Sequence, residues 1–330
     1  MAYQNTPVEN GYQVAQQLAS FAASVGWTVH RQGEQTDING STLYYEVTIS
    51  ASGYPCYVTI AGYNNRIELN GHRGYDSSKR WWEQPDQYVY YNGDGEYTDS
   101  YEDETRTICE LRVNPILSVH LFGGMSPTPY LYAAIEKEPG YYRHLTIGHL
   151  QKFGTAKGGM FWDVSNRRKY NGYHSYPYNH RAPLLNADNA DGYNDGPGGF
   201  DTQKSDGTPY FNRFGYVSYD QNRSRMSTGG HHATELHSVF TASPIAFNAR
   251  TPLQVPMVFA NTYTPFGTAP AMRYVDLTYF EAGDELVVGN ETWKLFPWAR
   301  RTYGVRNSNS DYSGPEYEAT HMYGIAYLKD

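Results

Sequence analysis

Apolar residues near the start of the chain recur at the spacing of an α-helix. They lie three or four positions apart and would share one face of the helix: Val14, Leu18, Phe21, Ala22 and Val25. Thr6 is suited to cap the first turn, Pro7 to occupy its first position, and Glu9 to complete a capping box. Gly26 can adopt the left-handed conformation that commonly ends a helix. The pattern predicts one helix over residues 7–25.

Beyond the helix the period changes to two, which is typical of β-strands. Alternation over residues 43–50, a turn at residues 52–55 and a return over residues 56–60 predict a hairpin. Strand-like alternation recurs along the rest of the chain, over residues 108–122, 130–136, 143–150, 159–164, 251–263, 273–280, 285–288, 291–296 and 323–328. Gly289-Asn290, between two of these strands, predicts a second hairpin turn. We therefore expect an α+β fold that is mostly antiparallel β, with one N-terminal helix packed on a sheet.

Long loops rich in Tyr, Gly and Asn separate these elements. The longest, over residues 165–232, exceeds what a compact chain usually carries unless the loop is functional or disordered. We expect a helix-plus-antiparallel-sheet core over residues 1–164, a loop or arm over residues 165–240, and a β-rich segment over residues 241–330. The arm is predicted to order against neighbouring subunits, with a flexible linker as the alternative. The last segment either completes the sheet or forms a second small β-domain.

Tyrosine occupies 33 of the 330 positions. Disordered chains are poor in aromatic residues, so a chain with this content is expected to fold. Tyrosine also gives a large contact area for little loss of side-chain entropy, which favours surfaces that face other proteins. About half of the tyrosines are accounted for as ordinary strand residues.

The net charge and the cysteine content indicate which partners and which cellular compartment to expect. A formal net charge of −8 opposes non-specific binding to nucleic acid, and we expect no specific nucleic-acid recognition. Cys56 and Cys109 are too few for a disulfide framework, which fits a reducing cytoplasm, and both thiols are expected to be buried. The first residues lack a signal-peptide pattern, and no apolar run reaches the ~18 residues of a membrane span. We expect a soluble protein without membrane contact.

Residues 143–162 combine two short apolar runs with a loop punctuated by glycine. Their histidines and basic residues have no spacing that suits a metal site or a nucleophile–base pair. The stretch therefore predicts a strand–loop–strand unit that presents backbone and long side chains to a neighbour. Its residues resemble a motif in virion structural proteins of tailed bacteriophages: His144-Leu145-x-Ile147-Gly148-x-Leu150-x-Lys152-Phe153-Gly154, followed by Gly158-Gly159-x-Phe161.

A second block carries the same resemblance: Asn248-Ala249-Arg250-Thr251-Pro252-Leu253, Arg273-Tyr274-Val275, Glu281-Ala282-Gly283-Asp284 and Trp293-Lys294-Leu295-Phe296-Pro297. With the N-terminal helix and hairpin, the resemblance spans most of the chain. It implies a virion subunit that assembles in the host cytoplasm. Because tail-terminator and related neck proteins use a similar helix-plus-sheet core, it also implies a collar-, gateway- or tail-terminator-like ring at the head-to-tail junction. The partners would be copies of this chain and neighbouring head–tail or tail proteins.

A second class of function stays open. A peripheral tail or baseplate protein would use aromatic loops to stack on glycans of the host surface, and the Tyr and Trp content also suits that role.

Candidate interface residues are the basic residues of the central stretch, the basic and aromatic residues of the arm, and the basic pair near the C-terminus. They are Lys152, Lys157, Arg167, Arg168, Tyr170, Tyr173, Tyr176, Tyr178, Arg300 and Arg301. A ring needs two different complementary patches on each subunit. The acidic run over residues 94–104 and the basic residues within 300–306 are candidates for these two patches.

We expect no enzyme activity, cofactor or metal. The sequence has no Gly-x-Ser-x-Gly elbow, no phosphate-binding loop of the Walker type and no cysteine pairs at zinc-ribbon spacing, although two facing carboxylates remain an alternative. His231, Glu235 and His237 would suit a metal only if their segment were helical, and a polar interface is the alternative. The acidic residues 94–104 lack the alternation of a calcium loop, which favours a solvated loop or a partner for a basic patch.

Overall fold

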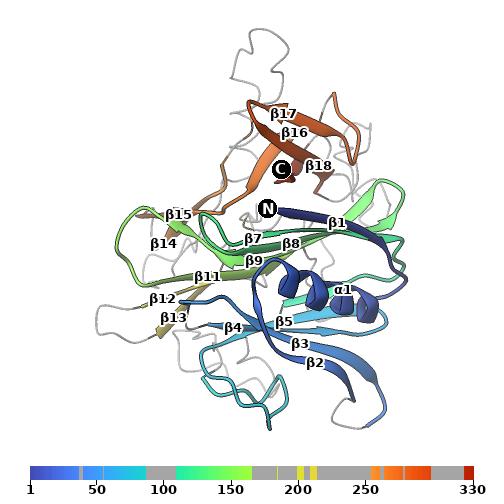
Figure 1. Cartoon of the computed structure of the whole chain (residues 1–330), viewed down its shortest axis with the longest axis vertical. Helices are drawn as coiled ribbons and strands as arrows, with labels where there is room; N and C mark the ends of the chain where they lie inside the picture. The colour runs from blue at the N-terminus through green and yellow to red at the C-terminus, as the bar shows by residue number, and fades with distance from the viewer. Residues whose placement is uncertain are drawn as a thin grey trace, which may run out of the picture.

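A computed structural model describes residues 1–36, 40–54, 56–86, 109–165, 184, 199–203, 209–213, 253, 255–260, 264–277, 279–298 and 323–330. These residues form a layered β-rich molecule. A five-stranded sheet and a seven-stranded sheet pack with one helix beside them, and a four-stranded sheet lies on the other side of the seven-stranded sheet (Figure 1). The predicted fold class is confirmed: mostly antiparallel β with a single N-terminal helix on a sheet.

Helix α1 (Gly11–Ser24) starts later than predicted. Thr6 and Pro7 belong instead to strand β1 (Ala2–Pro7), where they pair with residues of β7 (Ser118–Gly124), so their backbone is extended and cannot enter a helix. The cap is Asn10, whose side chain accepts a hydrogen bond of 2.9 Å from the backbone N–H of Gln13. The predicted stop at Gly26 is confirmed by its φ of +98°.

The apolar face of α1 packs against the inner face of the five-stranded sheet. At the start of the helix the two backbones approach so closely that a Cβ on Gly11 would collide with the carbonyl of Tyr63, and one on Gly62 with the carbonyl of Gly11. The sheet has the order β2-β3-β4-β5-β6, and its strands are β2 (Thr28–Thr36), β3 (Leu43–Ser50), β4 (Tyr57–Gly62), β5 (Arg66–His72) and β6 (Cys109–Arg112). The predicted hairpin of residues 43–60 is β3 and β4. Cys56 is buried as expected, whereas the side chain of Cys109 lies outside the described set.

The central sheet has the order β1-β7-β8-β9-β11-β12-β13. Besides β1 and β7 its strands are β8 (Tyr130–Glu138), β9 (Tyr141–His149), β11 (Gly158–Val164), β12 (Gly199–Gln203) and β13 (Pro209–Arg213). The last two fall within residues 165–232, so the expectation of a continuous loop there is wrong for these strands. Phe200 is buried, and the carboxylate of Asp201 accepts a 2.6 Å hydrogen bond from the backbone N–H of Met160. These contacts attach β12 to the sheet.

The C-terminal part adds two smaller sheets. One has the order β10-β15-β14, with β10 (Gln151–Lys152), β15 (Thr264–Thr268) and β14 (Met257–Ala260). The other has the order β16-β19-β18-β17, with β16 (Met272–Asp276), β19 (Tyr323–Leu328), β18 (Glu291–Pro297) and β17 (Glu285–Val288). The hairpin predicted around Gly289-Asn290 and the terminal strand are confirmed, whereas the strands predicted over 251–263 and 273–280 are shorter than expected.

Within the described part of the chain, no helix has both the length and the apolar character that crossing a bilayer requires.

Candidate functional site

The first candidate site is the exposed end of the central hairpin, residues 151–158, which we call the hairpin tip. The two arms of this hairpin, β9 and β11, are almost completely buried, whereas residues 153–157 are exposed. The Phe153 side chain is 56% exposed. In Figure 1 the tip is the light-green turn at the left of the view, beside β14 and β15.

The hairpin tip is held in one conformation by contacts on both sides. Gln151 and Lys152 pair with β15, and the backbone N–H of Phe153 donates to the carbonyl of Phe266 at 3.0 Å. The ammonium of Lys152 donates to the carbonyl of Ala156 across the turn at 2.6 Å. Of the glycines that punctuate this stretch, Gly158 (+86°) and Gly159 (+107°) have the positive φ that a bend requires. Gly148 and Gly154 do not, and Gly148 lies within β9. The exposed Phe153 is therefore presented on a fixed backbone.

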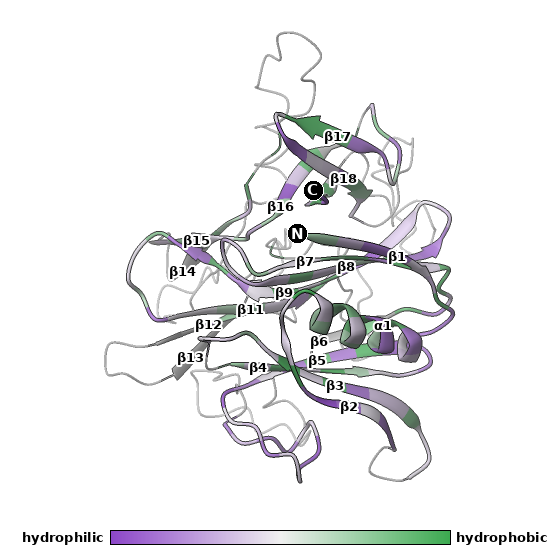
Figure 2. Cartoon of the chain, in the orientation of Figure 1, coloured by the Kyte–Doolittle hydropathy of each residue, from purple (hydrophilic) through white to green (hydrophobic). Residues whose placement is uncertain are grey.

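The second candidate site is β17, which we call the β17 edge. This strand is last in its sheet and pairs with β18 alone among the described strands. Val287 is 67% exposed and Val288 48% exposed. Figure 2 shows this strand as a hydrophobic ribbon at the top of the molecule. An outermost strand also offers unpaired backbone groups to a further strand or chain.

The base of the β17 edge is fixed by charge. The Glu285 carboxylate lies 3.1 Å from the ammonium of Lys329 and 3.3 Å from that of Lys294. Hydrogen bonds from these two lysines lower the pKa of Glu285. The strand that carries the two exposed valines is thus tied to both β18 and the C-terminal residues.

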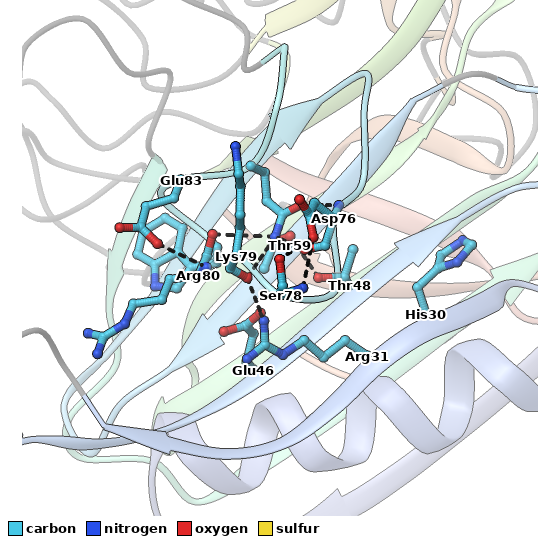
Figure 3. A network of polar contacts seen from close by, with 12 residues as sticks. His30, Arg31, Glu46, Thr48, Thr59, Asp76, Ser78, Lys79, Arg80 and Glu83 are labelled. Atoms are coloured by element: carbon cyan, nitrogen blue, oxygen red, sulfur yellow. Dashed lines mark hydrogen bonds and ion pairs between the residues drawn. The ribbon is translucent and has the colours of Figure 1, made fainter.

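A third candidate is the polar network on the outer face of the five-stranded sheet, shown in Figure 3. Glu46 is completely buried there, and its carboxylate lies 3.3 Å from the guanidinium of Arg31. Burial raises the pKa of Glu46, while Arg31 and the Tyr44 hydroxyl oppose the shift. A buried carboxyl group with a shifted pKa beside an arginine can belong to an active site or to a structural ion pair. The contacts around Glu46 distinguish these two roles.

A row of hydrogen bonds crosses the same face. His72 Nδ1 lies 2.6 Å from the carbonyl of Gly74, which can only accept, so Nδ1 carries the proton. His72 Nε2 then accepts from the Thr59 hydroxyl at 2.9 Å, and Thr59 accepts from Thr48 at 2.9 Å. Burial lowers the pKa of His72 to about 4, which keeps this arrangement neutral. Thr48, Thr59 and His72 each donate their side-chain proton to another group of the protein.

Residues 73–86 cover this network. The Gln84 side chain binds the segment to itself, accepting from the backbone N–H of Asp76 at 2.8 Å and donating to the carbonyls of Asp76 and Lys79 at 3.0 Å each. Arg31 donates to the carbonyl of Lys79 at 2.7 Å and so joins the segment to the sheet (Figure 3). The network thus fastens a covering segment and does not present a reacting group to solvent.

The expected interface residues divide into two sets. Lys152 and Lys157 both lie in the hairpin tip, and Lys157 is exposed. The others lie outside the described residues: Arg167, Arg168, Tyr170, Tyr173, Tyr176, Tyr178, Arg300 and Arg301. The acidic run 94–104 and the cluster of His231, Glu235 and His237 lie outside them as well. Among the residues that the structure does describe, no three His, Cys, Asp or Glu side chains are grouped to hold a metal ion.

Sequence reasoning missed the β17 edge and the Glu46 network. Val287 and Val288 are adjacent in a predicted hairpin arm. Because successive side chains of a strand point to opposite faces of the sheet, both valines cannot face the core, and the sequence therefore indicates that one of them is exposed. Glu46 occupied a polar position in an alternating strand, which predicts a side chain facing solvent. Only the tertiary placement of residues 73–86 buries it.

In comparisons with known proteins, neither a family model nor a curated protein matches this chain. Its function is therefore inferred from its own residues and geometry.

Proposed function

We propose that this protein is a structural subunit of a tailed-phage virion. It works through contacts with copies of itself and with neighbouring particle proteins. Its place is the neck, in a collar-, gateway- or tail-terminator-like ring between head and tail, and it is assembled in the host cytoplasm.

The observation that carries this proposal is the hairpin tip. The residues that resemble the phage motif form a hairpin whose arms are buried in the central sheet and whose end is exposed with Phe153 and Lys157. Because the end is already fixed by hydrogen bonds, little conformational entropy is lost when a partner covers it. A preorganised apolar side chain of this kind suits protein–protein contact.

The separation of the two exposed sites also favours a ring. Subunits in a ring meet through heterologous contacts, so each must carry two different patches. The hairpin tip lies at the left of Figure 1 and the β17 edge at the top, on different sides of the molecule.

Binding of host glycans, as a tail or baseplate protein, is the second candidate. It is favoured by an aromatic group on the outer face of the five-stranded sheet. The rings of Tyr57 and Tyr75 stack with centroids 5.8 Å apart, and the exposed His30 lies 5.0 Å from Tyr57. Both tyrosines are half-buried, and Tyr57 also stacks on the buried His72 with centroids 5.6 Å apart, so the group offers a partly exposed aromatic surface to a sugar.

Assembly and cell binding separate the two functions. We expect the purified chain to form rings visible by electron microscopy, or to join heads or tails purified from an infection in which its gene is disrupted. A Tyr57→Ala/Tyr75→Ala variant should assemble like the wild type, because these two residues belong to neither proposed contact site. A chain that stays monomeric, binds no particle, and binds host cells in a manner abolished by this double variant would instead be a glycan-binding protein.

A further inference from the structure

We propose that the hairpin tip of one copy binds the β17 edge of the next copy, so that successive copies join head to tail. This inference rests on the proposed function, because it names the pair of surfaces through which copies of the chain would assemble.

The hairpin tip is cationic and aromatic. The segment 150–160 contains Lys152 and Lys157 and no acidic residue, although the whole chain has a net charge of −8. Phe153 lies between the two lysines in sequence and is 56% exposed. The tip therefore offers one large apolar side chain flanked by positive charge.

The β17 edge has the complementary character. The segment 281–291 contains four acidic residues and no basic residue: Glu281, Asp284, Glu285 and Glu291. Val287 and Val288 supply exposed aliphatic side chains in its middle, one on each face of the strand. Lys294 and Lys329 offset part of this charge at Glu285, whereas Asp284 is exposed at the turn before the strand. The edge therefore offers an apolar surface flanked by negative charge.

Charge selects between the possible pairings. Two tips brought together would place lysines against lysines, and two β17 edges would place acidic residues against acidic residues, which opposes both symmetric contacts. Only the tip-to-edge pairing joins opposite charges around an apolar centre. Because the two sites lie on different sides of the molecule (Figure 1), this pairing joins separate copies and repeats around an axis.

Cysteine cross-linking tests the pairing directly. The variants Lys157→Cys and Val287→Cys place one exposed thiol in each site, and Ala23→Cys, on an exposed position of α1, is the matched control. A short bismaleimide is added to assembled protein, and linked peptides are identified by mass spectrometry. We expect a 157–287 link when the first two variants are mixed, and none when either is used alone or mixed with Ala23→Cys. The wild-type protein, treated in the same way, serves as the control for any reaction of the native Cys56 and Cys109.

A charge variant gives a second readout. Lys157→Glu should weaken self-association about 3- to 10-fold at low salt, and less at high salt, because exposed charges are screened. Lys79→Glu alters an exposed lysine outside both sites and should leave association unchanged.

The outcomes distinguish this inference from the proposed function. A 287–287 or 157–157 link, or assemblies that form without any 157–287 link, would overturn the tip-to-edge pairing while leaving a virion subunit that uses other surfaces. If wild-type protein neither self-associates nor joins particles, the proposed function fails together with this pairing.

Discussion

The central sheet is buried on both faces, yet the two faces are built from different side chains. Toward α1 and the five-stranded sheet it presents mainly aliphatic residues, among them Leu121, Leu131, Ile135, Leu145 and Ile147. Toward the C-terminal sheet it presents aromatic residues and histidines, among them Phe122, Tyr130, Tyr132, Phe161, His120 and His144. One sheet therefore has two kinds of core.

The aromatic face also forms directed polar contacts with the C-terminal part of the chain. Tyr132 donates through its hydroxyl to the carbonyl of Pro270 at 2.6 Å. His144 Nε2 lies 2.8 Å from the carbonyl of Pro297, so Nε2 carries the proton and Nδ1 accepts from the Tyr327 hydroxyl at 3.0 Å. Burial lowers the pKa of His144 to about 4 and so keeps it neutral.

The two faces show two ways in which a core can be stabilised: by apolar packing alone, or by packing together with hydrogen bonds. The aliphatic face is held by volume and apolar area, which tolerate small shifts of the packed layers. The aromatic face adds hydrogen bonds with fixed partners, which define how the C-terminal sheet lies on the central sheet. Part of the high tyrosine content is therefore used inside the protein, since Tyr44, Tyr130, Tyr132, Tyr274 and Tyr327 are fully buried.

The largest effect is expected on the aliphatic face, at Trp162. Its ring lies against β5 where a Cβ on Gly71 would overlap it, so the side chain fills the space between the two sheets. Trp162→Ala should lower the free energy of unfolding by about 3–5 kcal/mol, measured by urea denaturation with circular dichroism. The exposed Phe153→Ala is the control and should change stability by less than about 0.5 kcal/mol. A Trp162→Ala loss as small as that of the control would show that the aliphatic face is not tightly packed.

A smaller effect is expected on the aromatic face when the pH falls. The pKa of His144 is about 4 in the folded protein and about 6.5 when unfolded, so the unfolded chain binds more protons between these values. Stability is therefore full above pH 6.5 and is lost as the pH falls toward 4. His144 alone accounts for about 1.5 kcal/mol between pH 6.5 and pH 5.

The contribution of His144 is measured by comparing urea midpoints at several pH values for wild type and His144→Gln. The variant is expected to be less stable at pH 7 but to lose less stability on acidification, because the glutamine does not titrate. His72, His120 and His149 also have a pKa lowered to about 4 by burial, so an acid-dependent loss should remain in the variant. Equal slopes in both proteins would mean that His144 is not buried as the neutral form.

How much of this could be predicted depends on whether local sequence or tertiary contact decides each feature. The period-two alternation located most strands and the hairpin around Gly289-Asn290. The helix start was misplaced because Thr6 and Pro7 pair with β7, a contact more than a hundred residues away in sequence. Strands β12 and β13 were missed because five residues between Gly- and Asp-rich runs give too short a pattern.

The sequence also did not predict that one face of the central sheet is aliphatic and the other aromatic. Strand β8 begins Tyr-Leu-Tyr-Ala-Ala-Ile, which is apolar or aromatic at every position, so alternation cannot reveal which residues face which layer. For the candidate site, the strand–loop–strand pattern placed Lys152 and Lys157 near the end of a hairpin. It did not show that Phe153 is exposed, because a phenylalanine is ordinarily expected inside, even when polar residues and glycine surround it in sequence.

The smallest effect on stability is expected from removing a single tyrosine hydroxyl on the aromatic face. We compare a hydroxyl that has a hydrogen-bond partner with one that has none among the described residues. Tyr327→Phe leaves His144 Nδ1 buried without its donor, so we expect a loss of about 1 kcal/mol. Tyr130→Phe is the matched control: its ring is fully buried on the same face, but its hydroxyl has no hydrogen-bond partner among the described residues. Removing that hydroxyl should be neutral or slightly stabilising, because an unsatisfied polar atom leaves the core.

Both variants keep the aromatic ring and therefore the packed volume, so urea denaturation at pH 7.5 isolates the hydrogen bond. If the two variants have equal stability, the aromatic face is held by volume alone, as the aliphatic face is. If only Tyr327→Phe is destabilised, the pairing of His144 with Tyr327 fixes the C-terminal sheet in place, and the two faces of the central sheet differ in mechanism as well as in composition.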